Sequence, residues 1–327
     1  MWLSPSLLLI ILSIITRIFL VVSSPSLFVA WIGLELNTLA FIPLLLIKKT
    51  KITVESSIKY FLTQTLASIL IIIGGLILII FIREIGAIFI FLGIIIKLGG
   101  APFHRWVVRV AESLPWISLF ILLTVQKINP LFLIWNFCDT RQLFYNFIVI
   151  RSLVVGGLVG LAQTRTRALI TFSSINHVGW LLASLNFDIK LGVLYFSTYL
   201  IILLVPVLIF FKTNISHLNQ LPFIKINLSA QVILFFSLLS LGGLPPFLGF
   251  LPKWMILQLL CSHSFFLLRL IIVIISLLTL FFYLRLIFSA FIFGGMSVLG
   301  GEKDQLSFFH VFLFTISVGG LFLVYLI

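Results

Sequence analysis

The stretch Lys97-Leu-Gly-Gly-Ala-Pro-Phe-His104 interrupts one long apolar run of the chain, and Leu241-Gly-Gly-Leu-Pro-Pro-Phe-Leu-Gly249 interrupts another. Glycine pairs beside proline lower helix propensity and remove backbone hydrogen-bond donors. At membrane depth such a break is tolerated only where protein or a water-lined cavity satisfies the freed backbone groups. The two stretches therefore predict two broken helices within a membrane-spanning fold.

The composition of the whole chain is that of a membrane protein. Hydrophobic residues make up 62% of the 327 residues and charged residues only 9%, whereas a soluble domain carries roughly 25% charged residues. This excludes a water-soluble globular fold. The apolar runs each approach the roughly 20 residues that cross a bilayer as a helix, and they lack the alternation of barrel strands. We predict an all-α polytopic membrane protein with about eleven transmembrane helices. Their predicted spans are about 3–22, 26–47, 56–80, 84–110, 114–136, 145–163, 168–186, 190–211, 227–261, 265–293 and 305–326.

The two breaks resemble each other in sequence, and each lies in the fourth of five consecutive predicted helices. Interrupted helices at matching places in two halves are the sequence sign of an internal repeat with a transport site. Because five is odd, the second half would cross the membrane in the opposite sense. We predict one membrane domain over residues 1–327, with inverted repeats at about 1–140 and 141–294 and an appended helix at about 305–327.

The charges indicate an orientation rather than a nucleic-acid partner. The net charge is +13, but no basic stretch is longer than Lys48, Lys49 and Lys51. Most basic residues fall in short gaps on one side of the predicted spans, which marks that side as the cytoplasm or the mitochondrial matrix. The N-terminus is therefore predicted inside and the C-terminus outside. Cys138 and Cys261 are isolated, so neither a disulfide framework nor a metal site is predicted.

Four ionisable residues lie inside or beside apolar spans: Glu35, Lys97, Lys127 and Lys253. Each costs about 2.5–3.5 kcal/mol on insertion scales and is a functional hypothesis by default. Burial disfavours the charged form of any such group, and a nearby opposite charge favours it, so these residues can exchange protons where water connects them. The alternative for a Lys near a helix end, above all Lys253, is that it snorkels to the interface. Glu35 has no long stem, so we expect it to face inward.

Two histidines are weaker candidates as proton relays. His104 adjoins the first break, and His177 lies near the start of the predicted helix at 168–186. A structural, hydrogen-bonded histidine is at least as good an interpretation of either. Arg269 and Arg285 share one predicted helix without nearby acids, so we expect them to snorkel or to contact a neighbouring subunit or lipid. Four polar residues are candidates to hold water or to join helices: Asn37, Thr124, Gln126 and Asn129.

At these residues the sequence resembles a known family. The stretches that carry the resemblance are Trp31-Ile-Gly-Leu-Glu-Leu-Asn37, Lys97-Leu-Gly-Gly-Ala-Pro-Phe-His-Arg-Trp106, Gln126-Lys-Ile-Asn-Pro130 and Gly242-Gly-Leu-Pro-Pro-Phe-Leu-Gly-Phe-Leu-Pro-Lys-Trp254. They resemble the subunit 2 family of mitochondrial NADH:ubiquinone oxidoreductase (respiratory complex I), one of its antiporter-like membrane subunits. The resemblance extends from end to end of the chain.

The resemblance implies two inverted five-helix repeats with broken helices, and animal members lack the three leading helices of their bacterial relatives. It also implies a hydrated proton axis in which Glu35 and Lys97 match a Glu–Lys pair, Lys127 matches a central Lys, and Lys253 matches a final Lys. We expect Glu35 and Lys97 to lie within salt-bridge or one-water reach. One departure from the family pattern is Arg105, where relatives often carry an apolar or aromatic residue.

In function, the resemblance implies a proton-translocating subunit of an NADH:ubiquinone reductase in the mitochondrial inner membrane, with the N-terminus in the matrix and the C-terminus in the intermembrane space. The chain would carry no redox centre, because NADH, flavin, iron–sulfur clusters and ubiquinone are expected in other subunits. Expected partners are membrane-arm subunits, especially subunit 4 and the small subunit 4L, and phospholipid. Two alternatives stay open from the residues: a stand-alone cation/proton antiporter and a purely structural scaffold.

Overall fold

The computed structural model describes residues 5–47, 50–80, 83–137, 142–223, 228–262, 266–292 and 315, and the regular elements in these segments are helices. Seven helical segments there are long and apolar enough to cross a membrane, and shorter apolar helices accompany them. This confirms the predicted all-helical membrane fold. The predicted last helix at 305–327 lies outside the described residues, apart from residue 315, so the number eleven stays a prediction.

The chain divides into two compact units, Met1–Ile148 and Val149–Ile327. The helices of the first unit are α1 (Pro5–Val22), α2 (Leu27–Leu45), α3 (Lys51–Ile79), α4 (Arg83–Leu98), α5 (Arg105–Ser113), α6 (Trp116–Leu123) and α7 (Val125–Phe137). The helix α8 (Gln142–Leu161) passes from the first unit into the second. The second unit continues with α9 (Thr166–Leu185), α10 (Ile189–Thr213), the 3-10 helix η1 (Leu218–Phe223), α11 (Leu228–Gly242), α12 (Phe250–Ser262) and α13 (Phe266–Ile292).

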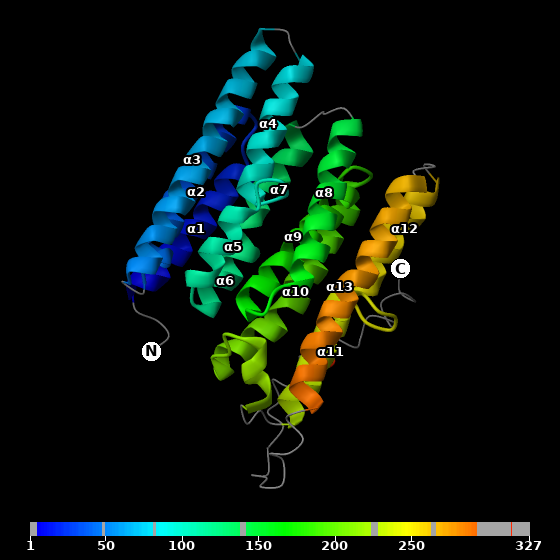
Figure 1. The fold of residues 1–327 in the computed structure, drawn as a ribbon. Helices are drawn as coiled ribbons and strands as arrows, with labels where there is room; N and C mark the ends of the chain where they lie inside the picture. Colours follow the sequence, from blue (N-terminus) through cyan, green and yellow to red (C-terminus); the bar gives the residue numbers. More distant parts are fainter. Residues whose placement is uncertain are drawn as a thin grey trace. The chain divides into compact units, whose positions relative to one another are not determined.

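In the first unit, small residues let long helices approach closely. Figure 1 shows α3 and α4 running side by side, and a Cβ added at Gly93 of α4 would lie 2.6 Å from the carbonyl oxygen of Ala67 on α3. Close backbone approach at small residues is how membrane helices gain packing energy. On the neighbouring pair, Arg17 of α1 donates a hydrogen bond to the carbonyl of Leu36 on α2 at 2.8 Å. This mid-span arginine was not singled out from the sequence.

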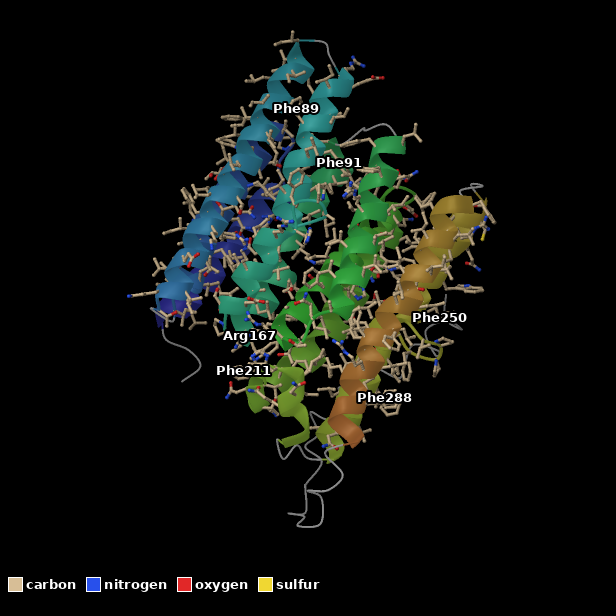
Figure 2. All side chains as sticks on the ribbon, in the orientation of Figure 1. Phe89, Phe91, Arg167, Phe211, Phe250 and Phe288 are labelled. Atoms are coloured by element: carbon tan, nitrogen blue, oxygen red, sulfur yellow. The ribbon has the colours of Figure 1, made fainter. Side chains whose placement is uncertain are left out.

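In the second unit, nearly all residues of α9 are buried. Gly156 of α8 lies against it, because a Cβ there would be 2.6 Å from the backbone nitrogen of Asn176. By contrast, other helices carry exposed large apolar side chains, among them Phe288 of α13, which is labelled in Figure 2. Such exposed apolar faces are what lipid or neighbouring membrane helices would cover.

Both predicted breaks are confirmed. α4 ends at Leu98 and α5 begins at Arg105, while α11 ends at Gly242 and α12 begins at Phe250. Each first half-helix is followed by a glycine with positive φ, +70° at Gly99 and +78° at Gly243. In both breaks the residue after this glycine donates its N–H to the carbonyl five residues earlier, which is the Schellman arrangement that satisfies helix-end carbonyls.

The first break is closed further by an indole. Trp106, on the second half of the broken helix, donates its Nε1–H to the carbonyl of Ile96 on the first half at 2.9 Å. Side-chain donors of this kind satisfy carbonyls that have lost their partners within the helix. The backbone around Gly99 is therefore held by neutral hydrogen bonds.

A third interruption was not predicted. The span expected at 114–136 is divided at Thr124, whose φ and ψ are −120° and −76°, between α6 and α7. The Thr124 hydroxyl donates to the carbonyl of Phe120, and the carbonyl of Thr124 accepts the N–H of Lys127 at 3.0 Å. Competition between a threonine hydroxyl and the helix ladder explains this irregularity locally. Lys127 thus lies in the first turn of a new helix.

Arg285 forms hydrogen bonds to another helix of this chain, which the sequence analysis did not predict. Its Nη1 donates to the carbonyl of Leu161 at 2.7 Å, and its Nη2 donates to the carbonyl of Gln163. These acceptors are at and just beyond the C-terminal end of α8. A cation at that end satisfies free carbonyls and complements the helix dipole. Arg285 is therefore a cap that ties α13 to α8 within the second unit.

Replacing Arg285 with Met is expected to destabilise the protein, because two charge-assisted hydrogen bonds are lost and each is worth about 1.5–3 kcal/mol. The melting temperature of the solubilised protein measures the effect. Arg269→Met is the matched control, since Arg269 on the same helix contacts Cys261 and the ring of Phe266 at the exposed end. Equal melting temperatures for the two variants would contradict the capping role.

Candidate functional site

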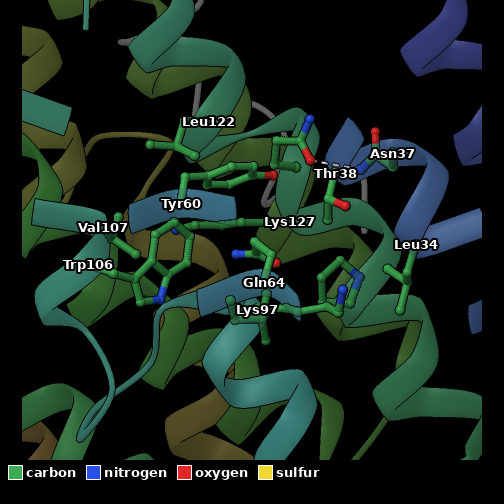
Figure 3. Close-up of a pocket in the computed structure, with 13 residues that line it drawn as sticks. Leu34, Asn37, Thr38, Tyr60, Gln64, Lys97, Trp106, Val107, Leu122 and Lys127 are labelled. Atoms are coloured by element: carbon green, nitrogen blue, oxygen red, sulfur yellow. Dashed lines mark hydrogen bonds between the residues drawn. The ribbon is translucent and has the colours of Figure 1, made fainter. Parts of the chain in front are cut away.

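Two of the predicted lysines open to one cavity in the first unit. Lys97 of α4 and Lys127 of α7 both line it, and Figure 3 shows their side chains reaching toward it from different helices. Lys97 is 6% exposed and Lys127 is 3% exposed. The space open to the centres of water molecules measures about 20 Å³, and roughly 10–15 Å³ suffices for one water. The cavity that the two lysines line therefore has room for one or two waters.

Polar side chains from three helices line the same cavity. Asn37 of α2 donates its Nδ2–H to Gln126 Oε1 of α7 at 2.7 Å, so the two candidates named from the sequence join α2 to α7 (Figure 3). Tyr60 and Gln64 of α3 also line the cavity, and the sequence analysis missed both. The spacing of Tyr60 and Gln64 could have revealed them, because residues four apart share one face of a helix. This face of α3 is buried.

The Lys97 ammonium has no hydrogen-bond partner among the residues that the structure describes, although its Nζ is buried. Lys97 lies in the last turn of α4, where the helix dipole favours a cation. A buried ammonium without protein partners is costly unless water reaches it. The cavity provides room for that water, so the geometry suits a lysine that exchanges protons with water.

Glu35 lies on α2 near the cavity residues but is not itself part of the lining. It is half-buried, and its Oε2 lies 3.4 Å from the Thr38 hydroxyl. In the described part of the chain no ion pair joins Glu35 to Lys97, although the two interact electrostatically. The expected direct salt bridge is therefore absent from the structure, and a link through one water stays a prediction.

In the second unit, Lys253 is held deep in the protein and does not snorkel. It is 5% exposed, and its Nζ donates to the carbonyls of Leu241 at 3.1 Å and Gly242 at 2.8 Å. These carbonyls end the first half of the broken helix. The ammonium also lies 5.5 Å from the ring centroid of Trp180, a distance at which a cation and an aromatic face attract each other.

His177 is a buried, hydrogen-bonded residue in the middle of α9, not near its start. It is 4% exposed, and its Nδ1 lies 2.8 Å from the hydroxyl of Tyr195. The ring of Tyr195 stacks on that of Trp180, the aromatic residue beneath Lys253. Contacts thus run from Lys253 through Trp180 and Tyr195 to His177. The sequence analysis did not identify Trp180 or Tyr195, because aromatic residues on an apolar helix look like core.

His104 occupies a different place from the other candidates. It directly precedes α5 within the first break, is half-buried, and is not one of the residues that line the first cavity. The structure therefore does not bring His104 together with Lys97 and Lys127 in that cavity, and its role as a relay stays a prediction.

Comparison with known proteins identifies the family. Residues 24–83 and 81–279 match the family model described as NADH:quinone oxidoreductase/Mrp antiporter, transmembrane region. NADH-ubiquinone oxidoreductase chain 2 of Anopheles gambiae is 39% identical over 324 residues, which are 94% of this chain and 93% of that protein. The chain belongs to the chain 2 family of NADH-ubiquinone oxidoreductase. The resemblance inferred from the sequence is thereby confirmed.

Two solved structures share the fold of this chain 2 family member. A chain of respiratory complex I from Thermus thermophilus has a TM-score of 0.84 at 20% identity, over 96% of this chain and 77% of that one. A chain of the Mrp complex from Dietzia has a TM-score of 0.79 at 18% identity, over 86% of this chain and 60% of that one. The antiporter-like fold is therefore shared, while the names of the sequence relatives favour complex I over a stand-alone antiporter.

Proposed function

We propose that this chain 2 family member is a proton-translocating membrane subunit of complex I. The observation that carries the proposal is the cavity that both Lys97 and Lys127 line, with room for water and with polar groups around it. Amines that are buried but reachable by water can gain and lose protons without leaving the protein. Glu35 would influence Lys97 electrostatically, and Lys253 would be a second exchanging group in the other unit.

In this proposal the chain moves protons and other subunits move electrons. NADH, flavin, iron–sulfur clusters and ubiquinone would be held elsewhere in the complex, and the relays His104 and His177 would be auxiliary. The partners would be membrane-arm subunits, especially subunit 4 and the small subunit 4L, together with phospholipid. The two halves of the chain would be inverted repeats in the mitochondrial inner membrane, with the N-terminus in the matrix, as the distribution of basic residues supports.

Replacing Lys127 with Met tests the proposal in the intact complex. Met keeps the length and apolar stem of the side chain but removes the exchangeable proton, so NADH-driven proton uptake by reconstituted vesicles is expected to fall at least tenfold, as for other general acid–base groups. Lys59→Met is the matched control: Lys59 lies on the same unit, away from the cavity lining, and forms a surface ion pair with Glu55, a kind of pair that contributes little to stability.

Two outcomes would contradict this proposal. Normal proton uptake by an assembled Lys127→Met complex would favour a structural role for the cavity. Sodium- or potassium-dependent proton exchange by the chain alone in liposomes would favour the stand-alone antiporter.

A further inference from the structure

The second break holds an ammonium in an unusual environment. Lys253 Nζ contacts two terminal carbonyls of α11 and the face of Trp180. No carboxylate lies within ion-pair distance of it in the described segments. The titratable groups nearest along the contacts from Trp180 are Tyr195 and His177. The positive charge is therefore balanced by backbone dipoles and a π face, so its position depends on the local path of the backbone.

Gly243 permits the backbone conformation at the end of α11, and its lack of a side chain leaves room for Lys253. Its φ of +78° suits glycine, and a Cβ added there would lie 2.7 Å from Lys253 Cδ and 2.9 Å from Lys253 Nζ. Real Cβ atoms essentially never come this close to another heavy atom. At the preceding residue, Gly242, an added Cβ would have no neighbour closer than 3.7 Å.

The first break provides an internal comparison. Gly99 takes the same place after its half-helix and has a similar φ of +70°, yet a Cβ there would meet Val107 at 2.0 Å and not the ammonium of Lys97. The two glycines therefore share a backbone role, and only Gly243 faces a lysine ammonium.

We propose that Gly243 is a positioning residue for Lys253, which keeps the ammonium against the carbonyl end of α11. The proposal rests on the function proposed above for Lys253. A side chain at position 243 would push the ammonium away from the carbonyls of Leu241 and Gly242. The Lys253 amine could still bind and release a proton, but it would no longer contact these carbonyls. Proton exchange and the geometry of the second break are thus linked through one glycine.

Backbone strain alone could also explain a harmful effect of a substitution at Gly243, since any residue other than glycine is disfavoured at positive φ. A double-mutant cycle separates the two, because residues in contact show non-additive effects and distant residues do not. Lys253→Ala removes the Cδ and Nζ that an added Cβ would strike. Strain at position 243 would persist in that background, whereas the collision would vanish.

The experiment uses the whole complex that contains this chain, with Gly243→Ala made alone and together with Lys253→Ala. Melting temperature and the amount of assembled complex are measured for each variant. We expect Gly243→Ala to lower the melting temperature, and we expect the same change to lower it by less when Lys253 is Ala. Gly99→Ala, made in both backgrounds, is the control and is expected to have the same effect in each.

An equal shift for Gly243→Ala in both backgrounds would overturn the proposal and leave strain as the explanation. If Gly243→Ala alone prevents assembly, recovery of assembly in the Lys253→Ala background supports the proposal, and no recovery overturns it. Failure of the proton-translocation proposal would look different. In that case an assembled Lys253→Met complex would pump protons normally while positions 243 and 253 remained coupled in stability.

Discussion

Replacing Lys253 with Met is expected to abolish most NADH-driven proton uptake while the complex still assembles. Met preserves the apolar stem that packs in the site but has no proton to exchange. The Schellman hydrogen bonds of this break go to the carbonyls of Leu239 and Ser240 and do not involve Nζ, so the break itself should persist. Proton uptake by vesicles containing the purified complex measures the effect. Lys212→Met is the matched control, because Lys212 is an exposed lysine at the end of α10 in the same unit.

The Lys253→Arg variant distinguishes exchange from anchoring. Guanidinium stays protonated under essentially all conditions and donates hydrogen bonds as well as an ammonium does. If Lys253 must release its proton, Lys253→Arg pumps poorly. If Lys253 only holds the break together, the Arg variant pumps normally, and the exchanger role is wrong.

The second large effect is expected for Gly249→Ala, at the end of the second break. A Cβ at Gly249 would lie 1.8 Å from the carbonyl oxygen of Ser240. Overpacking a core costs about 1–3 kcal/mol when side chains can move, but here the obstacle is backbone in the last turn of α11. The loop between α11 and α12 would have to open, so we expect little or no assembled complex. The amount of chain that migrates with the NADH-oxidising complex on a native gel measures this.

Gly242→Ala controls for the loss of a glycine in the same break. The atoms nearest to its added methyl would be side-chain atoms of Leu280 and Tyr283, at 3.7 Å or more. Assembly of this variant should match the unmodified complex. Normal assembly of Gly249→Ala would mean that the loop can shift by more than the structure suggests.

The breaks could be predicted from the sequence because their cause is local. Two glycines with a proline close behind lower helix propensity and remove a backbone donor, and the structure ends α4 and α11 at these stretches. The interruption at Thr124 could not be predicted in the same way. A threonine is tolerated within many helices, and only the packing around it decides whether its hydroxyl competes with the backbone.

The lysines of the candidate sites could be predicted because charge within an apolar run is rare and costly. Their surroundings could not be predicted to the same degree. Tyr60 of the first cavity and Trp180 beneath Lys253 have the residue types of an ordinary apolar core. The distance between Glu35 and Lys97 could not be predicted either, because the sequence places Glu35 on α2 without saying how closely α2 and α4 approach at that point.

The different donors at the two breaks have a consequence for an energised membrane. The first break is closed by the neutral indole of Trp106, whereas a lysine ammonium contacts the carbonyl end of the second. An electric field exerts force only on the charged donor, and a full transmembrane passage of one charge is worth about 2.3 kcal/mol per 100 mV. A voltage across the bilayer therefore pulls directly on the closure of the second break and leaves the indole closure of the first untouched.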